Sequence, residues 1–250
     1  GKLLASVFSV GGVILAEMVS GVVIVLARLD MDSLTANVIC ESFGAIAAFL
    51  LFLAIGGKTW APVRRDDISF ALEYGWWGLA IAFGLMLFDI GDYLYGSTSL
   101  SPQWASLLVE TFLMCLFIGV FEEFLFRGII FHALLAVMGD THKGLTRAVF
   151  VTSFIFGCAH ISFDTDFSSA LAATQAVLKI VQTGMFSVLL CTITLRTRHL
   201  AGVSVYHALD DFMLVAPSTV LFSEPLSTDY VLEGEEGMQT IWLYVIVIAL

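Results

Sequence analysis

Long apolar runs separated by short polar segments dominate the pattern of this chain. An α-helix needs about 20 apolar residues to cross the hydrocarbon core of a bilayer, and we interpret eight runs as such spans. They cover residues 3–27, 35–55, 75–88, 105–138, 148–163, 170–195, 200–221 and 240–250. The run over 105–138 exceeds one crossing, so we expect it to tilt, protrude or break, with Gly128 and Gly139 as candidate break points. The pattern predicts an all-α, polytopic transmembrane helical bundle of about eight spans.

Charges in the segments between the runs alternate along the chain. One set of segments carries eight of the eleven basic residues, namely Lys2, Lys58, Arg64, Arg65, Lys143, Arg147, Arg196 and Arg198. The other set carries Arg28 together with Asp30, Asp32, Asp89, Asp92, Asp164, Asp166, Glu224, Asp229, Glu233, Glu235 and Glu236. Because cytoplasmic loops carry the excess of Lys and Arg, the alternation places both termini in the cytoplasm.

Composition agrees with a membrane protein. Hydrophobic residues make up 59% of the 250 residues and charged residues only 13%, more apolar sequence than a soluble domain of this size needs. No hydrophilic domain or internal repeat is visible, which predicts a single membrane-embedded domain over residues 1–250. The net charge of −11 and the lack of a basic patch argue against nucleic acid as a partner. Oligomeric state cannot be predicted from this pattern.

Three charged residues interrupt the apolar run over 105–138. A charged group near the bilayer centre costs roughly 2.5–3.5 kcal/mol, so Glu122, Glu123 and Arg127 need a reason to be there. In a helix Glu123 and Arg127 are four residues apart and share a face, so they can neutralise each other. Glu122 points about 100° away and remains as a carboxylate in an apolar site, where it can act as a general base.

Two histidines in other runs add to this pattern. His160 follows small residues at 157–159, which let a neighbouring helix approach closely, and His207 shares a helical face with Asp211. Taken singly, His160 is also explained as a structural histidine and His207–Asp211 as an ordinary buried pair. Taken together with Glu122, one His could help to activate a water and the other could donate to an oxyanion. That is the minimum for peptide hydrolysis without a covalent intermediate.

Other chemistries have weaker support. Ser153, Ser162 and Ser204 lack a GxSxG context, and HExxH is absent. We expect no cofactor, although Zn²⁺ held by Glu122, His160 and His207 around an open position stays an alternative. A proton-coupled transporter is disfavoured because no matching inverted halves are visible.

Three motif blocks resemble those of a known family. The blocks are Glu122-Glu123-x-x-x-Arg127, Phe156-x-x-x-His160 and His207-x-x-x-Asp211. In this order, on separate predicted spans, they resemble the CAAX protease and bacteriocin-processing (Abi) family, which includes the eukaryotic CAAX prenyl endopeptidase. The resemblance covers about residues 105–214 and implies a membrane-embedded glutamate protease.

The resemblance also implies roles for the site residues. Glu122 and His160 would hold and activate the water, Glu123 and Arg127 would brace the site, and His207 would help to form the oxyanion hole. The family often has Asn where this chain has Asp211. A carboxylate stabilises an oxyanion only when protonated, so we expect Asp211 to orient His207 or to be uncharged.

The sequence therefore predicts an intramembrane endopeptidase that cleaves a membrane-associated or lipidated peptide or protein within the lipid bilayer. A non-catalytic bacteriocin-immunity or regulatory membrane protein that retains the fold is one alternative, and a zinc-dependent version of the protease is another. The compact chain favours a bacterial plasma membrane, or the ER membrane if the protein is eukaryotic.

Overall fold

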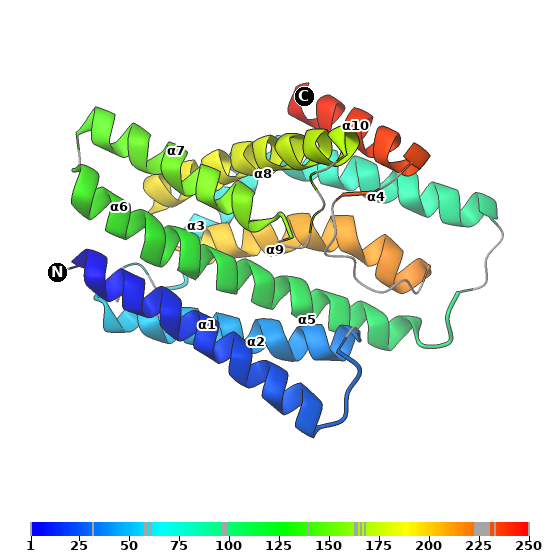
Figure 1. Ribbon diagram of the computed structural model, residues 1–250, viewed down its shortest axis with the longest axis horizontal. Coiled ribbons are helices and arrows are strands. Elements are labelled where there is room, and N and C mark those ends of the chain that lie inside the picture. Colours follow the sequence, from blue (N-terminus) through cyan, green and yellow to red (C-terminus); the bar gives the residue numbers. More distant parts are fainter. Residues whose placement is uncertain are drawn as a thin grey trace. The chain divides into compact units, whose positions relative to one another are not determined.

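A computed structural model describes residues 2–31, 33–57, 60, 62–96, 100–139, 141–162, 165, 167, 169–222, 231–232 and 234–249 (Figure 1). In chain order the elements are α1 (Lys2–Leu26), α2 (Leu34–Ala54), α3 (Arg65–Tyr74), α4 (Trp76–Gly96), α5 (Trp104–Glu122), η2 (Glu123–Ile130), α6 (Phe131–Met138), α7 (His142–Ala159), α8 (Ala170–Thr197), α9 (Ala201–Ala216), η3 (Pro217–Leu221) and α10 (Gly234–Ala249). Within the described ranges no strand occurs, so the predicted all-α class is confirmed.

Among the described residues, five helices are long and apolar enough to cross a membrane. They are Leu4–Leu26, Leu34–Ala54, Trp76–Gly96, Trp104–Met138 and Ala170–Thr197. The remaining predicted spans fall on α7, which carries three basic or imidazole side chains in its first turns, and on α9 and α10, which have 16 residues each. A polytopic helical protein is thus supported, while the count of eight spans and the side of the termini stay predictions. The charges Lys58, Asp32, Asp164, Asp166, Glu224, Asp229 and Glu233 lie outside the described residues.

The long run over 105–138 forms one continuous helical segment that changes its winding in the middle. Residues Glu123–Ile130 are π-helical, and the N–H of Phe131 donates to the carbonyl of Phe126, five residues back. Gly128 lies inside this wider turn and does not break the helix, whereas Gly139 adopts φ +80° directly after the helix ends. Single π-helical turns inside α-helices occur frequently at functional sites.

The helix α3 was not predicted, and its ten residues lie between two predicted spans. Asp66 and Asp67 lie in its first turn, where negative charge favours the helix N-terminus. The helix packs closely on α9, because a Cβ at Gly202 would collide with the carbonyl oxygen of Asp67. This contact helps to fix the start of α9.

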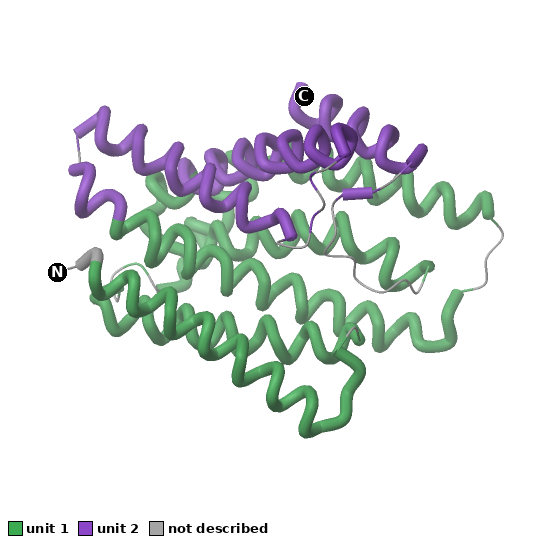
Figure 2. Tube along the Cα trace, viewed as in Figure 1, with its two compact units in different colours: residues 1–133, 193–226 green, residues 134–192, 227–250 purple. Residues whose placement is uncertain are grey.

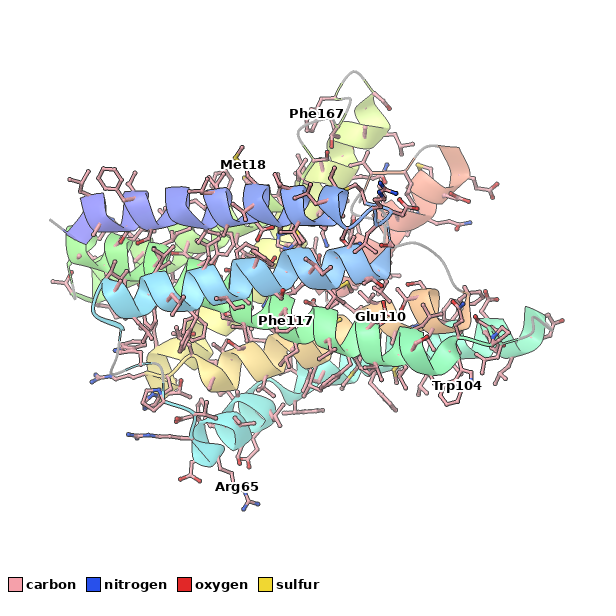
Figure 3. The ribbon with its side chains drawn as sticks, turned by 90° about the horizontal axis from the view of Figure 1, so that it is seen from below. Met18, Arg65, Trp104, Glu110, Phe117 and Phe167 are labelled. Carbon is pink, nitrogen blue, oxygen red and sulfur yellow. The ribbon has the colours of Figure 1, made fainter. Side chains whose placement is uncertain are left out.

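The chain divides into two compact units (Figure 2). Unit 1 comprises residues 1–133 and 193–226, and unit 2 comprises residues 134–192 and 227–250. In unit 1, α2 packs against both α1 and α5, and Figure 3 shows Met18 on the face of α1 that points away from α2. Such exposed apolar side chains are what a lipid-facing helix presents. The prediction of a single membrane domain stays a prediction.

In unit 2, α7 and α8 pack closely at small residues. A Cβ at Gly157 would lie 2.5 Å from the carbonyl oxygen of Ile180, which confirms the predicted close approach at residues 157–159. Gln175 of α8 both donates to the carbonyl of Leu232 at 2.8 Å and accepts from its N–H at 3.0 Å. This paired contact anchors the segment that leads into α10.

Candidate active site

A fully buried ion pair lies at the centre of unit 1. Arg127 Nη1 is 2.9 Å from Glu123 Oε1, and both side chains are 0% exposed. The pair spans one turn of η2, as the spacing of four residues predicted. Removing one partner of a buried pair leaves an uncompensated charge and costs about 3–5 kcal/mol, so each residue requires the other.

His207 of α9 contacts this pair and two further acids. Its Nδ1 is 2.8 Å from Glu123 Oε1; since a carboxylate only accepts, this nitrogen carries a proton. Its Nε2 faces Glu122 Oε2 at 3.6 Å and Asp211 Oδ2 at 3.5 Å. The imidazole is 3% exposed, whereas the Glu122 and Asp211 side chains are 19% and 24% exposed. Glu122 and Asp211 are therefore the accessible members of the cluster.

Two glycines and a tyrosine bring α9 close enough for these contacts. A Cβ at Gly119 of α5 would lie 2.5 Å from the carbonyl oxygen of Ser204 and 2.9 Å from the backbone nitrogen of Ala208, so a side chain would clash there. On another face, the Tyr206 hydroxyl donates to the carbonyl of Gly75 at 3.0 Å, and a Cβ at Gly75 would collide with the Tyr206 ring. The position of His207 thus depends on close backbone contacts on two sides of α9.

An acid from α1 reaches toward the same region. The Cys40 thiol donates to Glu17 Oε2 at 2.7 Å. The other carboxylate oxygen of Glu17 lies over Gly44, where a Cβ would collide with it and would lie 3.1 Å from the ring of Phe121. Glu17 and Phe121, the residue before Glu122, therefore both pack on Gly44.

Glu41 of α2 is a second acid that was not among the predicted site residues. It lies close enough to Glu122, Glu17 and Asp211 for their negative charges to act on it. Its Oε2 is buried and forms no hydrogen bond within the described residues. An isolated acid inside an apolar span was the available sequence signal, because such residues mark functional or paired positions.

His160 lies in unit 2, directly after the last residue of α7. Its Nδ1–H donates to the carbonyl of Phe156 at 2.8 Å, and the two rings are 4.6 Å apart. The structure therefore brings together five of the six predicted catalytic residues, all of them in unit 1. A shared site for His160 and Glu122 stays a prediction.

Within the described part of the chain, no group of three or more His, Cys, Asp and Glu side chains has an arrangement suited to a metal ion. The near neighbours of His207 are instead arranged as hydrogen-bond and charge partners of one imidazole.

Comparison with protein families gives one match that covers the site. Residues 103–213 match the family described as type II CAAX prenyl endopeptidase Rce1-like, and this segment contains all three motif blocks. Searches of curated proteins and of solved structures return no match. The matched range agrees with the predicted core at about residues 105–214. The segment that carries Glu122, His160 and His207 is therefore similar to the type II CAAX prenyl endopeptidase family.

Proposed function

We propose that this protein is an intramembrane endopeptidase that hydrolyses a peptide bond of a membrane-associated or lipidated substrate. The observation that carries the proposal is the contact of one buried imidazole with Glu122, Glu123 and Asp211. Arg127 neutralises Glu123, which leaves Glu122 at the accessible side of the cluster. The family match over residues 103–213 supports a protease in general.

In the proposed reaction Glu122 is the general base. Its carboxylate takes a proton from a water as the water oxygen forms a bond to the carbonyl carbon of the substrate. The carbonyl π-electron pair moves onto the carbonyl oxygen and forms an oxyanion. When the C–N bond breaks, Glu122 returns the proton to the leaving nitrogen, so no covalent enzyme intermediate forms.

His207 is proposed to stabilise the oxyanion. The hydrogen bond from Nδ1 to Glu123 fixes the orientation of the ring, and Arg127 holds Glu123 in turn. The contacts from Nε2 to Glu122 and Asp211 are 3.6 and 3.5 Å, longer than the 2.7–2.9 Å of a strong charge-assisted hydrogen bond. Since Nδ1 already carries a proton, a second proton on Nε2 makes the ring an imidazolium. The Nε2–H of this imidazolium is not held tightly by either acid and can donate to an oxyanion instead.

His160 enters the proposal through the family resemblance as the second group that binds the water. The donation from its Nδ1–H to Phe156 leaves Nε2 as the nitrogen with a lone pair. A neutral imidazole in this tautomer accepts a hydrogen bond from water, which helps to orient the water oxygen. This role needs Nε2 of His160 and the carboxylate of Glu122 to share one cavity.

The setting of the reaction is proposed to be a bilayer. Five described helices are long and apolar enough to cross it, and the loop charges support eight spans with both termini in the cytoplasm. A single membrane-embedded domain would then hold the site, in a bacterial plasma membrane or, for a eukaryotic protein, the ER membrane. A substrate with a lipid anchor would reach such a site by lateral diffusion.

The test uses the purified protein in lipid vesicles with fluorogenic peptides that end in a CAAX sequence, with and without a prenyl group. Glu122→Gln and His160→Ala are expected to lower kcat by at least about 100-fold, because each removes a group that acts on the water. Glu110→Gln is the matched control, since Glu110 lies on the same helix and accepts from Thr35 at 2.7 Å (Figure 3). Full activity of Glu122→Ala would exclude the proposed mechanism.

The same assay separates the alternatives. A non-catalytic immunity or regulatory protein would show no turnover, and its biological effect would survive Glu122→Gln. A zinc-dependent protease would lose activity after chelation and recover it with added Zn²⁺. The proposed metal-independent reaction requires that chelated protein, free of zinc by elemental analysis, keeps its kcat.

A further inference from the structure

We propose that His132 is a positioning residue for this reaction, which holds the π-helical segment η2 in the form that places Glu123 and Arg127. The inference rests on the function proposed above and adds a residue outside the three motif blocks. His132 is half-buried and lies two residues after η2 ends. Neither the spacing of the motifs nor the family match assigns it a role.

The change from π- to α-helical winding explains the contact that His132 makes. In η2 the last backbone hydrogen bond runs from the N–H of Phe131 to the carbonyl of Phe126, five residues back. A regular α-helical step is four residues, which directs the N–H of His132 toward the carbonyl of Gly128. The carbonyl of Arg127 lies between these two acceptors in the sequence, and the His132 side chain contacts it.

The imidazole of His132 forms a hydrogen bond with the carbonyl of Arg127. Its Nδ1 is 2.8 Å from the carbonyl oxygen of Arg127, and because a carbonyl only accepts, Nδ1 is the donor. A polar backbone group left unpaired in a buried segment costs free energy, so this hydrogen bond stabilises the wider winding of η2 over a regular α-helix. His132 thereby acts on the backbone of Arg127, which forms the buried pair with Glu123.

The His132 ring also packs against residues that contact the start of α9. The ring packs edge-to-face on Trp60, with centroids 4.3 Å apart, and lies 5.9 Å from Phe52. The Trp60 carbonyl accepts from the N–H of Leu200, the residue before α9, at 3.1 Å. A Cβ at Gly128 would lie 3.0 Å from Phe52 and 3.2 Å from Leu200, so both side chains pack directly on η2. We call His132, Trp60, Phe52 and Leu200 the latch.

The latch sets the distance between the two elements that make the site. Glu123 lies on η2, and His207 lies on α9 about two turns after Leu200. Their 2.8 Å hydrogen bond depends on how closely α9 lies on η2. A displacement of about 1 Å at a reacting group can cost about 100-fold in rate, so a small shift at the latch is enough to slow the reaction.

Two substitutions at His132 separate the effect of its hydrogen-bond donor from the effect of its aromatic ring. His132→Phe keeps an aromatic ring against Trp60 and Phe52 but removes the donor to Arg127. His132→Asn places an amide N–H near the position of Nδ1 and restores a donor. We expect His132→Phe to lower kcat about 10- to 100-fold with little change in KM, and His132→Asn to recover a large part of kcat. His142→Phe is the control, because His142 is exposed at the first residue of α7.

A second measurement does not depend on turnover. The ¹⁵N spectrum of the histidine side chains in the unsubstituted protein is expected to show His132 with its proton on Nδ1. Amide hydrogen exchange over residues 127–132 is expected to be faster in His132→Phe than in His132→Asn, because the wider turn loses its side-chain hydrogen bond.

The outcomes distinguish this inference from the proposed function. If Glu122→Gln abolishes cleavage but His132→Phe keeps the normal kcat, or changes only KM, the inference is wrong and the proposed function stands. If the unsubstituted protein cleaves no peptide, the proposed function fails, and the role of His132 in η2 is then judged by the spectrum and by exchange. A neutral His132 with its proton on Nε2 would overturn that role as well.

Discussion

Two groups of acids in unit 1, one buried and one half-buried, differ in the partners that surround them. The arginine site, formed by Glu123, Arg127 and His207, contains one acid with a guanidinium at 2.9 Å and an imidazole at 2.8 Å. The acid pair, formed by Glu17 on α1 and Glu41 on α2, has one thiol donor at 2.7 Å and no contact with a basic side chain within the described part of the chain. The first arrangement fixes a geometry, whereas the second places the acid of Glu41 near Glu122 without a cation to hold either carboxyl group.

This difference suggests a division of roles in the proposed site. A fully paired and buried acid is suited to holding a histidine in one orientation. Carboxylates that accept from the second ring nitrogen of a metal-binding imidazole do the same. Acids without a cationic partner shift the charge of their neighbours, because like charges close together oppose ionisation. The arginine site is therefore expected to dominate stability, and the acid pair to act mainly on the chemistry of Glu122.

The largest effect is expected when the arginine site loses its cation. Arg127→Met keeps much of the side-chain length but leaves Glu123 charged and buried, which should lower the free energy of unfolding by about 3–5 kcal/mol. Denaturant or thermal unfolding in detergent measures this loss. Replacing both partners, as in Glu123→Leu with Arg127→Met, should recover most of it, because an apolar pair of similar volume is often as stable as the ion pair. An additive loss in the double variant would contradict the pairing.

An intermediate effect is expected when α9 is pushed away from the arginine site. Gly119→Ala places a methyl group 2.5 Å from the carbonyl oxygen of Ser204, so α5 and α9 must separate. We expect a loss of about 1–3 kcal/mol from overpacking, together with a lower kcat as His207 moves from Glu123. Gly84→Ala in α4 is the matched control, because its Cβ would meet nothing within 4 Å. Equal stability and activity of Gly119→Ala and Gly84→Ala would contradict the close packing of α5 on α9.

The sequence predicted the arginine site better than the acid pair, for a geometric reason. Glu123 and Arg127 lie on one helix, so their spacing alone indicated the contact that the structure contains. Glu17 and Glu41 lie on separate helices, and their meeting depends on how α1 and α2 are rotated about their axes. Both helices are apolar on nearly every face, so no polar stripe in the sequence fixed that rotation.

The π-helical winding of η2 likewise could not be predicted from the pattern of apolar residues. The sequence indicated that the run over 105–138 was too long for one regular span, but apolar residues suit π- and α-helical winding equally well. The π-helical segment contacts residues far along the chain, Phe52 and Leu200 at Gly128, as well as the nearby ring of His132. The helix α3 was missed because its ten residues, charged at the start, resemble a loop between spans.

The smallest effect on stability is expected for Glu41→Gln in the acid pair. Its comparison with Glu123→Gln in the arginine site is the sharpest test of the difference between the two groups. Glu123→Gln removes the charge that balances Arg127 and should cost about 3–5 kcal/mol. Glu41→Gln replaces an acid that faces Glu122, Glu17 and Asp211 by an uncharged amide, and Oε2 of Glu41 has no hydrogen bond to lose within the described residues. We expect this variant to unfold within about 1 kcal/mol of the unsubstituted protein, because the neighbouring acids oppose a charge at this position and Oε2 gives up no hydrogen bond. Parallel unfolding curves at neutral pH measure both changes. A loss at Glu41 as large as that at Glu123 would mean that Glu41 has a cationic partner and that the two groups are held by the same kind of contact.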